Sequence, residues 1–430
     1  MKKLIIIILA LVLITPFLIG LKVETEYRIL IDNMNADPTY HIEITAFNKG
    51  WLTSDAKVKI TPVLPFNEQE QSPFELQLIQ NLQHGPLLWR TNGLGFGLVD
   101  SSISFEFPAD IQQQLNKVNT SNKEPLSITS RTSFDLSSKI HLELLPFKII
   151  DNQFEVEVKQ GTSLLTVTPD GQLKGQSSWG GISLKDELNQ QIAIEKSSTN
   201  IDMTLVTGEM FSPNAIFAGM MDLSIESMVA SGNDPTEKLT FKNMKLNAQS
   251  DANLETVGFK FALSSQLIES AFQKFEDFNF NFQIENFDTK TSQAISELLT
   301  KVQAGTVDPM QSSVQFQDML PALIAKNPII KITQLGATTT SGKLNNQLQV
   351  QFDQQIYDAN NPMTMITAIN ATASGYAPEV FFNELGMAAN IEQLVSQQYL
   401  KRENDNLTYQ FSFKNGQALL NNQPIPLGMF

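Results

Sequence analysis

Most of the chain alternates between apolar and polar residues with a period of two. The clearest stretch is 278–284, where four apolar side chains point to one side of the backbone and three polar ones to the other. Comparable stretches occur at 41–45, 57–60, 140–144, 154–158, 201–205, 239–241 and 348–352. A strand with one buried face produces this pattern, and closely spaced strands of this kind are typical of antiparallel meanders.

Turn-forming residues separate these stretches. The strongest signals are Pro169-Asp170-Gly171, Gly180-Gly181, residues 231–235 and Asn415-Gly416. Parallel strands would need a helix between successive strands, and most of the intervals are too short for one. We therefore predict a mainly β (α+β) fold, built as one long, twisted antiparallel sheet with a few packed helices.

Two regions have the periodicity of helices. Residues 289–302 place their apolar side chains on one stripe, and a second helical piece near 317–326 contains Pro321, which shortens it or marks its start. The other region, 378–400, begins with a proline that suits the first turn of a helix. We expect one β-rich domain over 22–430, with helical segments near 289–326 and 378–400; a division into two β-rich lobes is the alternative.

The first twenty-one residues form a separate segment. Two lysines are followed by an apolar run over 4–21. A helix of this length reaches about 27 Å, close to the roughly 30 Å hydrocarbon thickness of a bilayer. Residues 1–21 are therefore predicted to be a signal-anchor, a single N-terminal transmembrane helix that precedes the sheet.

The anchor also predicts a location. Because the cations precede the apolar run, the N-terminus should stay in the cytoplasm while the rest of the chain is translocated. No second run approaches this length, so we expect a single-pass protein of the bacterial inner membrane with most of its chain in the periplasm. A cleaved signal peptide is the competing interpretation, but the run does not end in a small-x-small cleavage site.

Charge and cysteine content narrow the function classes. The formal net charge is -15, and no basic run follows the N-terminus, which argues against nucleic acid and against binding of anionic lipid by charge. The chain has no cysteine, which removes disulfides, thiolate nucleophiles, lipid attachment at a cysteine and cysteine-based zinc sites.

The sequence contains no recognisable catalytic, metal or cofactor motif. Its three histidines, His41, His84 and His141, are far apart, and none belongs to a metal-binding spacing. No nucleophile elbow, phosphate loop or dinucleotide fingerprint is present, and the glycines of 93–97 fit a turn or strand edge. We predict no catalytic residue, no metal and no cofactor.

One short motif has two interpretations. In His84-Gly85-Pro86, the glycine permits an unusual backbone turn and the proline fixes the next φ angle. The simpler interpretation is a structural corner in which His84 caps a backbone group. The functional alternative is an imidazole used for recognition or catalysis.

Four features together resemble the YdgA-like family of bacterial envelope proteins, whose function is not established. They are the N-terminal apolar segment, Gly50-Trp51-Leu52-Thr53-Ser54 at the entry to a strand, His84-Gly85-Pro86, and a terminal hairpin with Asn415-Gly416-Gln417 and Asn421-Asn422-Gln423. In the second motif, Leu52 and Thr53 depart mildly from the family's pattern. The resemblance implies an inner-membrane protein that faces the periplasm, and it brings no active site.

These observations favour a non-catalytic envelope protein that binds lipid along an apolar sheet face. Phe275, Phe278, Phe280 and Phe282 are the candidate piece of that face. The structural alternative is that these phenylalanines are core residues covered by the helices. Two further functions stay open: a scaffold that binds other envelope proteins or itself, and a hydrolase of an envelope polymer.

Overall fold

The computed structural model describes residues 2–63, 75–91, 93–106, 125–150, 154–234, 236–358, 361 and 363–425, with side chains from Ile14 onward. The chain forms two compact units. Unit 1 comprises Met1–Leu184, Ser198–Phe217 and Gln293–Gln315, and unit 2 comprises Lys185–Ser197, Ala218–Ser292 and Phe316–Phe430. Each unit is built on an antiparallel sheet, and each is considered separately below.

The elements mainly in unit 1 are α1 (Lys2–Met34), β1 (Tyr40–Lys49), β2 (Thr53–Pro62), β3 (Leu76–His84), β4 (Leu87–Leu88), β5 (Gly95–Phe96), β6 (Val99–Glu106), β7 (Leu126–Thr132), β8 (Ser138–Leu144), β9 (Phe147–Ile150), β10 (Phe154–Val158), β11 (Gly161–Val167) and β12 (Gln172–Asp186). The residues of β13 (Gln191–Thr207), α3 (Thr289–Gln303) and α4 (Pro309–Ile324) are divided between the units.

The elements mainly in unit 2 are β14 (Ile216–Ser231), β15 (Lys238–Ala252), β16 (Thr256–Ser270), β17 (Lys274–Asp288), β18 (Ile329–Thr339), β19 (Gly342–Phe352), α5 (Thr364–Ala368), β20 (Ile369–Pro378), α6 (Glu379–Glu384), α7 (Ala388–Ser396), β21 (Lys401–Glu403), β22 (Asn406–Lys414), β23 (Gln417–Leu420) and β24 (Gln423–Ile425). The predicted mainly β architecture with antiparallel strands is confirmed.

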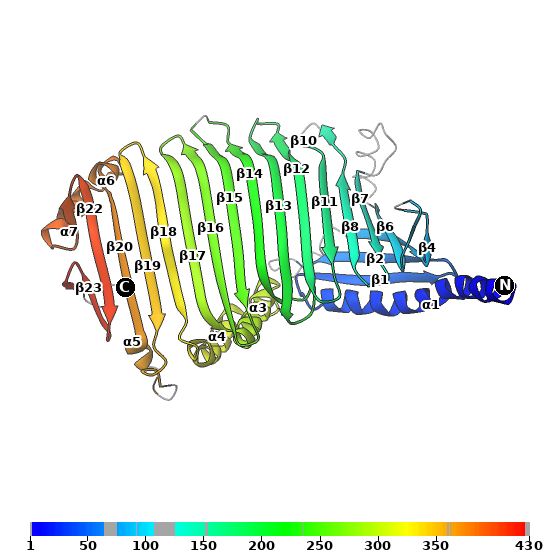
Figure 1. The fold of residues 1–430 in the computed structure, drawn as a ribbon. Coiled ribbons are helices and arrows are strands. Elements are labelled where there is room, and N and C mark those ends of the chain that lie inside the picture. Colours follow the sequence, from blue (N-terminus) through cyan, green and yellow to red (C-terminus); the bar gives the residue numbers. More distant parts are fainter. Residues whose placement is uncertain are drawn as a thin grey trace. The chain divides into compact units, whose positions relative to one another are not determined.

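In unit 1 the strands pair in the order β1–β2–β3–β6–β7–β8–β11–β12, each antiparallel to its neighbour. Helix α1 runs along β1 (Figure 1). Its buried or half-buried residues recur at helical spacing and face the sheet, where Ile31 packs between Ile42 of β1 and Val58 of β2. Helix α1 therefore covers one face of these two strands.

Polar contacts fix α1 at its C-terminal end. Asn35, just past the helix, donates from its side-chain amide to the Ile42 carbonyl at 2.8 Å and accepts from the Ile42 N–H at 2.7 Å. Nearer the N-terminus of the helix, Glu24 pairs with Lys49 of β1 at 3.1 Å. The helix is therefore tied to the first hairpin by both apolar packing and hydrogen bonds.

In unit 2 the strands pair in the order β14 to β20, followed by β22, β23 and β24. The long strands β14 to β20 lie side by side (Figure 1). Helices α5 and α6 lie against β20. Region 378–400 holds two short helices rather than one, because Gly386 takes φ +76° between α6 and α7.

Of the predicted turn residues, one pair forms a turn and another lies inside a strand. Asn415 and Gly416 take φ +52° and +75° between β22 and β23, as a tight two-residue hairpin turn requires. Gly180-Gly181, in contrast, lies inside β12 rather than at a turn. Gly181 has φ +117°, so the pair distorts the strand without ending it, and our expectation of a turn there was wrong.

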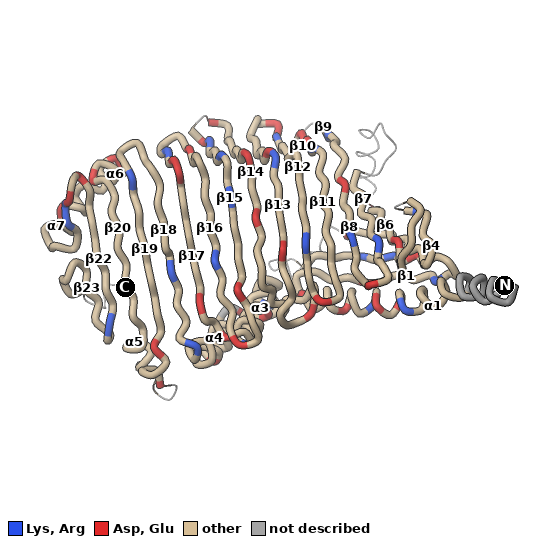
Figure 2. The backbone as a smooth tube through the Cα atoms, viewed as in Figure 1, with Lys and Arg blue, Asp and Glu red and all other residues tan. Residues whose placement is uncertain are grey.

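Charged residues are mixed along the described strands. Lys and Arg lie close to Asp and Glu rather than in one basic stripe (Figure 2). Several form ion pairs on the sheet surface, such as Lys331 with Glu285 at 2.8 Å and Lys148 with Glu155 at 2.6 Å. Exposed pairs of this kind contribute little to stability, about 0 to 1 kcal/mol each.

Within the described part of the chain, no helix combines the length and apolar character needed to cross a bilayer. The side chains of residues 1–13, which make up most of the predicted anchor, lie outside the described residues.

Packing of α1 on the first hairpin predicts a stability effect. We expect Ile42→Ala to destabilise unit 1 by about 3 kcal/mol, because it opens a cavity beside Ile31 and Val58. All three tryptophans lie in unit 1, so their fluorescence during urea denaturation reports on this unit. Glu43→Ala, at the next, exposed position, is the control and should change little. Equal losses in the two variants would contradict this account of how α1 is held.

Candidate functional site

Residues of two sequence motifs, the one that begins with Gly50-Trp51 and His84-Gly85-Pro86, meet on one side of α1. His84, the last residue of β3, is 1% exposed, and the helix backbone at Gly20 lies directly against its ring. A Cβ atom at position 20 would stand 2.7 Å from the His84 Nδ1 atom, so any side chain there would displace the helix or the imidazole. Pro16, one turn earlier, is buried on the same side of α1.

A buried serine accompanies the histidine. The Ser54 hydroxyl lies 3.1 Å from the His84 Nε2 atom, and Ser54 itself is 0% exposed. In the β2–β3 pairing Ser54 is opposite Leu82, which shares a face with His84 two residues on. The pair therefore belongs to the face of the sheet that α1 covers.

Burial decides the protonation preference of this imidazole. Loss of hydration lowers the pKa of His84 below its ordinary value of 6.5, and the nearby backbone carbonyls of Trp51 and Pro16 oppose the effect only in part. The Nδ1 atom has no hydrogen-bond partner of good geometry among the described residues. A neutral ring packed against a helix backbone fits these observations.

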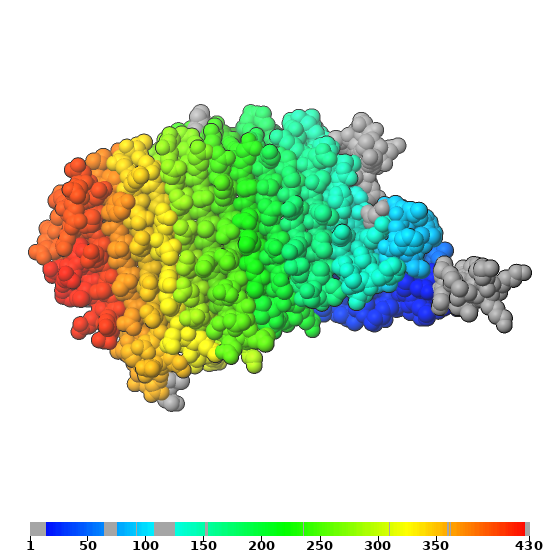
Figure 3. Space-filling model, viewed as in Figure 1, coloured from blue at the N-terminus to red at the C-terminus, as the bar shows by residue number. Residues whose placement is uncertain are grey.

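Trp51 packs on the same helix from the turn between β1 and β2. Its ring stacks on Phe17 of α1 with centroids 5.3 Å apart, while 53% of the residue stays exposed. Gly50 permits the tight turn, since its N–H donates to the Thr53 carbonyl at 2.8 Å and a Cβ atom would stand 2.7 Å from that oxygen. In Figure 3 the light-blue residues near position 90 stand next to dark-blue α1.

Gly85-Pro86 makes the corner that follows His84. The Gly85 N–H donates to the Leu98 carbonyl at 2.7 Å, and the peptide bond between Gly85 and Pro86 is cis. A Cβ atom at Gly85 would stand 2.9 Å from the Gly97 carbonyl carbon. Glycine is therefore needed where the corner passes this close to the strand that returns from β5.

The opposite face of β3 holds a separate polar group. Gln83 is opposite Asp100 of β6, and both are buried. Arg131 of β7 donates to the two Asp100 oxygens at 3.1 and 2.8 Å. Because neighbouring strand residues point to opposite faces, the Asp100 carboxylate is on the other side of the sheet from His84.

A hydroxyl beside an imidazole also occurs in hydrolases, where a third group orients the base. Here Ser54 is fully buried, and the second ring nitrogen of His84 faces the backbone of α1 rather than a carboxylate. The arrangement fits the structural interpretation of His84-Gly85-Pro86 better than the catalytic one.

Unit 2 carries an extended apolar face. One row of directly paired residues crosses nine strands, and every member is apolar: Met221, Ala248, Phe261, Phe282, Ile332, Leu348, Ala373, Phe411 and Leu420. A second row, two residues along, is also apolar: Phe259, Ile284, Ile330, Val350, Ala371, Phe413, Ala418 and Ile425. We call these two rows the apolar face.

On most of these strands the residue between the two rows is polar and points the other way; on β23 it is Leu419. The row Gln249, Lys260, Gln283, Lys331, Gln349, Thr372 and Ser412 crosses seven of the same strands. Antiparallel register therefore sorts the period-two pattern of each strand into one apolar and one polar surface.

Among the residues that the structure describes, no complete layer covers the apolar face. In its two rows only two alanines, Ala248 and Ala418, are buried; the other members keep part of their surface exposed, up to 37% for Phe259. Strands β14, β17 and β19 contain no buried residue at all. On β2, in contrast, Ser54, Ala56 and Val58 are buried at alternate positions, and on β1 Ile42 is buried against α1.

The four predicted phenylalanines divide between two places. Phe280 stacks on Phe282, with centroids 6.4 Å apart, and Phe278 precedes them on the same side of β17. Asp277 takes φ +51° and the register shifts there, so Phe275 is set apart and instead meets Phe381 of α6 at 6.3 Å. The apolar face thus includes part of the predicted set and many residues that the sequence did not single out.

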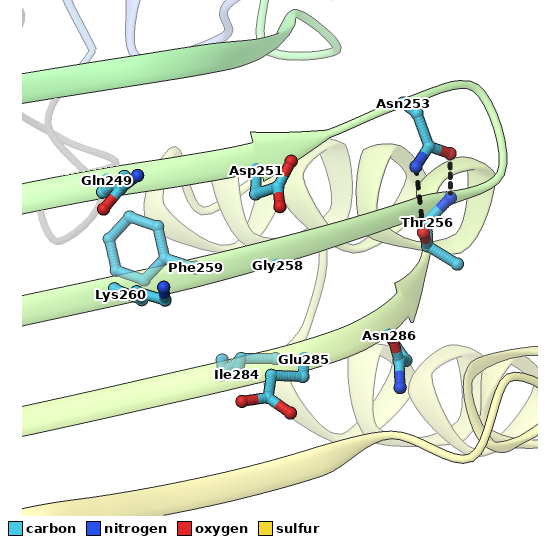
Figure 4. A pocket seen from close by; sticks show the side chains of 10 residues that line it. All are labelled: Gln249, Asp251, Asn253, Thr256, Gly258, Phe259, Lys260, Ile284, Glu285 and Asn286. Carbon is cyan, nitrogen blue, oxygen red and sulfur yellow. Dashed lines mark hydrogen bonds between the residues drawn. The ribbon is translucent and has the colours of Figure 1, made fainter.

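A hollow of about 320 Å³ lies over Gly258, where β16 has no side chain. Asp251 and Glu285 flank it from the neighbouring strands, and two hydrogen bonds join Asn253 to Thr256 at its end (Figure 4). Glu285 is paired with Lys331. Across the residues that the structure describes, no three His, Asp or Glu side chains gather as metal ligands.

A family model described as a bacterial protein of unknown function (DUF945) matches residues 1–428. Because this match covers nearly the whole chain, the chain belongs to that family. No curated protein and no solved structure matches the chain. The match agrees with the resemblance to an uncharacterised bacterial family that the sequence motifs carry.

The lowered pKa of His84 predicts a pH dependence. The unfolded chain takes up a proton near pH 6.5 while the folded ring resists it, so the stability of unit 1 should fall as the pH drops below 6.5. Urea denaturation at pH 7.5 and pH 5.5, followed by tryptophan fluorescence, measures this. His84→Gln should reduce the difference between the two pH values, and His41→Gln, at an exposed position of β1, should leave it unchanged. An identical pH effect in all three proteins would rule His84 out as its source.

Proposed function

We propose that this member of the DUF945 family is a membrane-anchored protein of the bacterial cell envelope that binds lipid acyl chains along the apolar face of unit 2. The observation that carries the proposal is the pair of uninterrupted apolar rows, whose large side chains are left partly exposed. A surface of this size in contact with water is unfavourable, because each buried large apolar side chain contributes about 1.5 to 3 kcal/mol.

The dimensions of the face suit extended hydrocarbon chains. Nine strands at a spacing of about 4.8 Å give a row about 38 Å long. One acyl chain covers roughly 15 Å, half the hydrocarbon thickness of a bilayer. The apolar face therefore offers room for more than one chain laid across the strands.

The chemistry of the face favours lipid over a protein partner. Its two rows contain only Phe, Met, Leu, Ile, Val and Ala, so they offer no hydrogen bond or charge that would orient a partner. An acyl chain needs none, whereas specific protein interfaces combine an apolar centre with several hydrogen bonds. A scaffold that binds other envelope proteins or itself is the second candidate, since an exposed apolar surface also suits a protein.

The proposed location rests on the sequence. The apolar run at 4–21, preceded by two lysines, supports an uncleaved anchor in the inner membrane with the two β-rich units in the periplasm. The motifs Gly50-Trp51 and His84-Gly85-Pro86 support the narrower resemblance to the YdgA-like envelope proteins. A hydrolase remains the third and weakest candidate, because it has no observation of its own in its favour.

The anchor can be tested by membrane extraction. We expect the full chain to stay in the membrane fraction after alkaline carbonate treatment. Val12→Arg puts a charge at the centre of the apolar run, which costs about 3 kcal/mol of insertion, so more of this variant should be released; Val12→Leu is the control. Release of a chain that lacks its first twenty or so residues would show that the segment is a cleaved signal peptide.

The apolar face can be tested with a photo-crosslinking residue. We expect benzoylphenylalanine in place of Phe282 to form phospholipid adducts when the full chain is irradiated in bacterial membranes, detected by mass spectrometry. The same residue in place of Gln283, the next position on the opposite face, should form none. Protein adducts at position 282 would favour the scaffold, and the same lipid yield at both positions would contradict binding along this face.

A further inference from the structure

Unit 1 exposes a group of apolar residues on two adjoining loops. Trp51 and Leu52 belong to the β1–β2 turn, and the others, Leu87, Trp89, Leu94 and Phe96, belong to the β4–β5 hairpin. Leu94 and Phe96 are 77% and 73% exposed. The loops adjoin because the Leu52 carbonyl accepts the N–H of His84, where the second loop begins. We call these six residues the apolar tip.

The hairpin is held in place, so its exposure is not a consequence of disorder. Leu88, between the exposed Leu87 and Trp89, is fully buried. The buried Gln83 side chain accepts the N–H groups of Trp89 and Arg90 at 3.0 and 2.9 Å.

A second contact secures the far side of this hairpin. Arg131, fixed by Asp100, donates to the Gly93 carbonyl at 2.8 Å. Buried polar groups thus support a hairpin that presents apolar side chains outward.

The composition of this region differs from the rest of the chain. Residues 84–99 contain no Asp or Glu and a single cation, Arg90, in a protein of net charge -15. The absence of carboxylates removes the repulsion that an anionic membrane surface would exert here. An exposed arginine next to Trp89 fits the boundary between headgroups and hydrocarbon.

The apolar tip lies at the anchor side of unit 1. Trp51 stacks on Phe17, which is itself part of the apolar run at 4–21. From Leu4 to Phe17 the helix rises about 20 Å, which is less than the roughly 30 Å of bilayer hydrocarbon. The full run can span the membrane only if the residues around Phe17, and whatever packs on them, also enter it.

We propose that the apolar tip of unit 1 is embedded in the outer-leaflet interface of the membrane that α1 crosses. Residues 14–21 can then remain packed on Trp51 and His84 while the apolar run spans the bilayer. Tryptophan suits this depth, since its ring is apolar and its N–H finds a partner among the headgroups. The occupant of the apolar tip is lipid, which the adjoining membrane-spanning segment brings within reach.

This inference rests on the proposed membrane anchor, and the test separates the two. The full chain is reconstituted into phosphatidylethanolamine–phosphatidylglycerol vesicles as three single-tryptophan variants, each retaining Trp51, Trp89 or Trp179 with the other two changed to Phe. Trp179 is the internal control. It lies on β12, five strands from β3 and about 24 Å away along the sheet. Quenching is measured with lipids brominated close to the headgroup.

We expect severalfold stronger quenching of Trp51 and Trp89 than of Trp179 in vesicles that carry the protein through a flotation gradient. If the chain floats but all three tryptophans are quenched equally weakly, the apolar tip is not in the bilayer and this inference is wrong, while the anchor stands. If the chain does not float with the vesicles, the anchor and this inference both fail.

Discussion

The structure depends on one constraint: the antiparallel register of unit 2 aligns apolar residues of neighbouring strands in rows on one face, and a slip of one residue would move a strand's apolar residues out of these rows to the other face. The paired rows from β14 to β24 satisfy this across up to nine strands, and the bulge at Asp277 occurs where Phe275 leaves the common face. A large apolar surface follows from this alignment alone. The proposed binding of acyl chains is the consequence of leaving that surface without a complete second layer.

In unit 1 a helix covers the apolar face of the first strands. Its first strands have the same alternation, but α1 covers them, so Ile42, Ala56 and Val58 are buried. The helix comes this close because Gly20 has no side chain at the point where it meets His84. The motifs Gly50-Trp51 and His84-Gly85-Pro86 therefore have a common physical role, which is to receive α1 and to turn the chain beside it.

The two proposals are linked through α1. One helix contains the apolar run that is proposed to cross the membrane and the segment that packs on β1 and β2, with no break between them. A domain joined to its anchor in this way is held near the lipid surface, unlike one on a flexible linker. The exposed tryptophans and the apolar hairpin beside the helix then lie next to lipid, and acyl chains are within reach of the protein.

The sequence by itself determined the local features: the strands with their two faces, the Asn415-Gly416 turn, and the apolar run at 4–21, because each follows from neighbours within a few residues. It also indicated Phe280 and Phe282 as part of an apolar face. It could not show that Ser54 would be buried beside His84, that Gly180-Gly181 would lie inside a strand, or that Gly20 would meet an imidazole. Only the tertiary structure decided these points, and whether each apolar face is covered, because they depend on contacts between residues far apart in the chain.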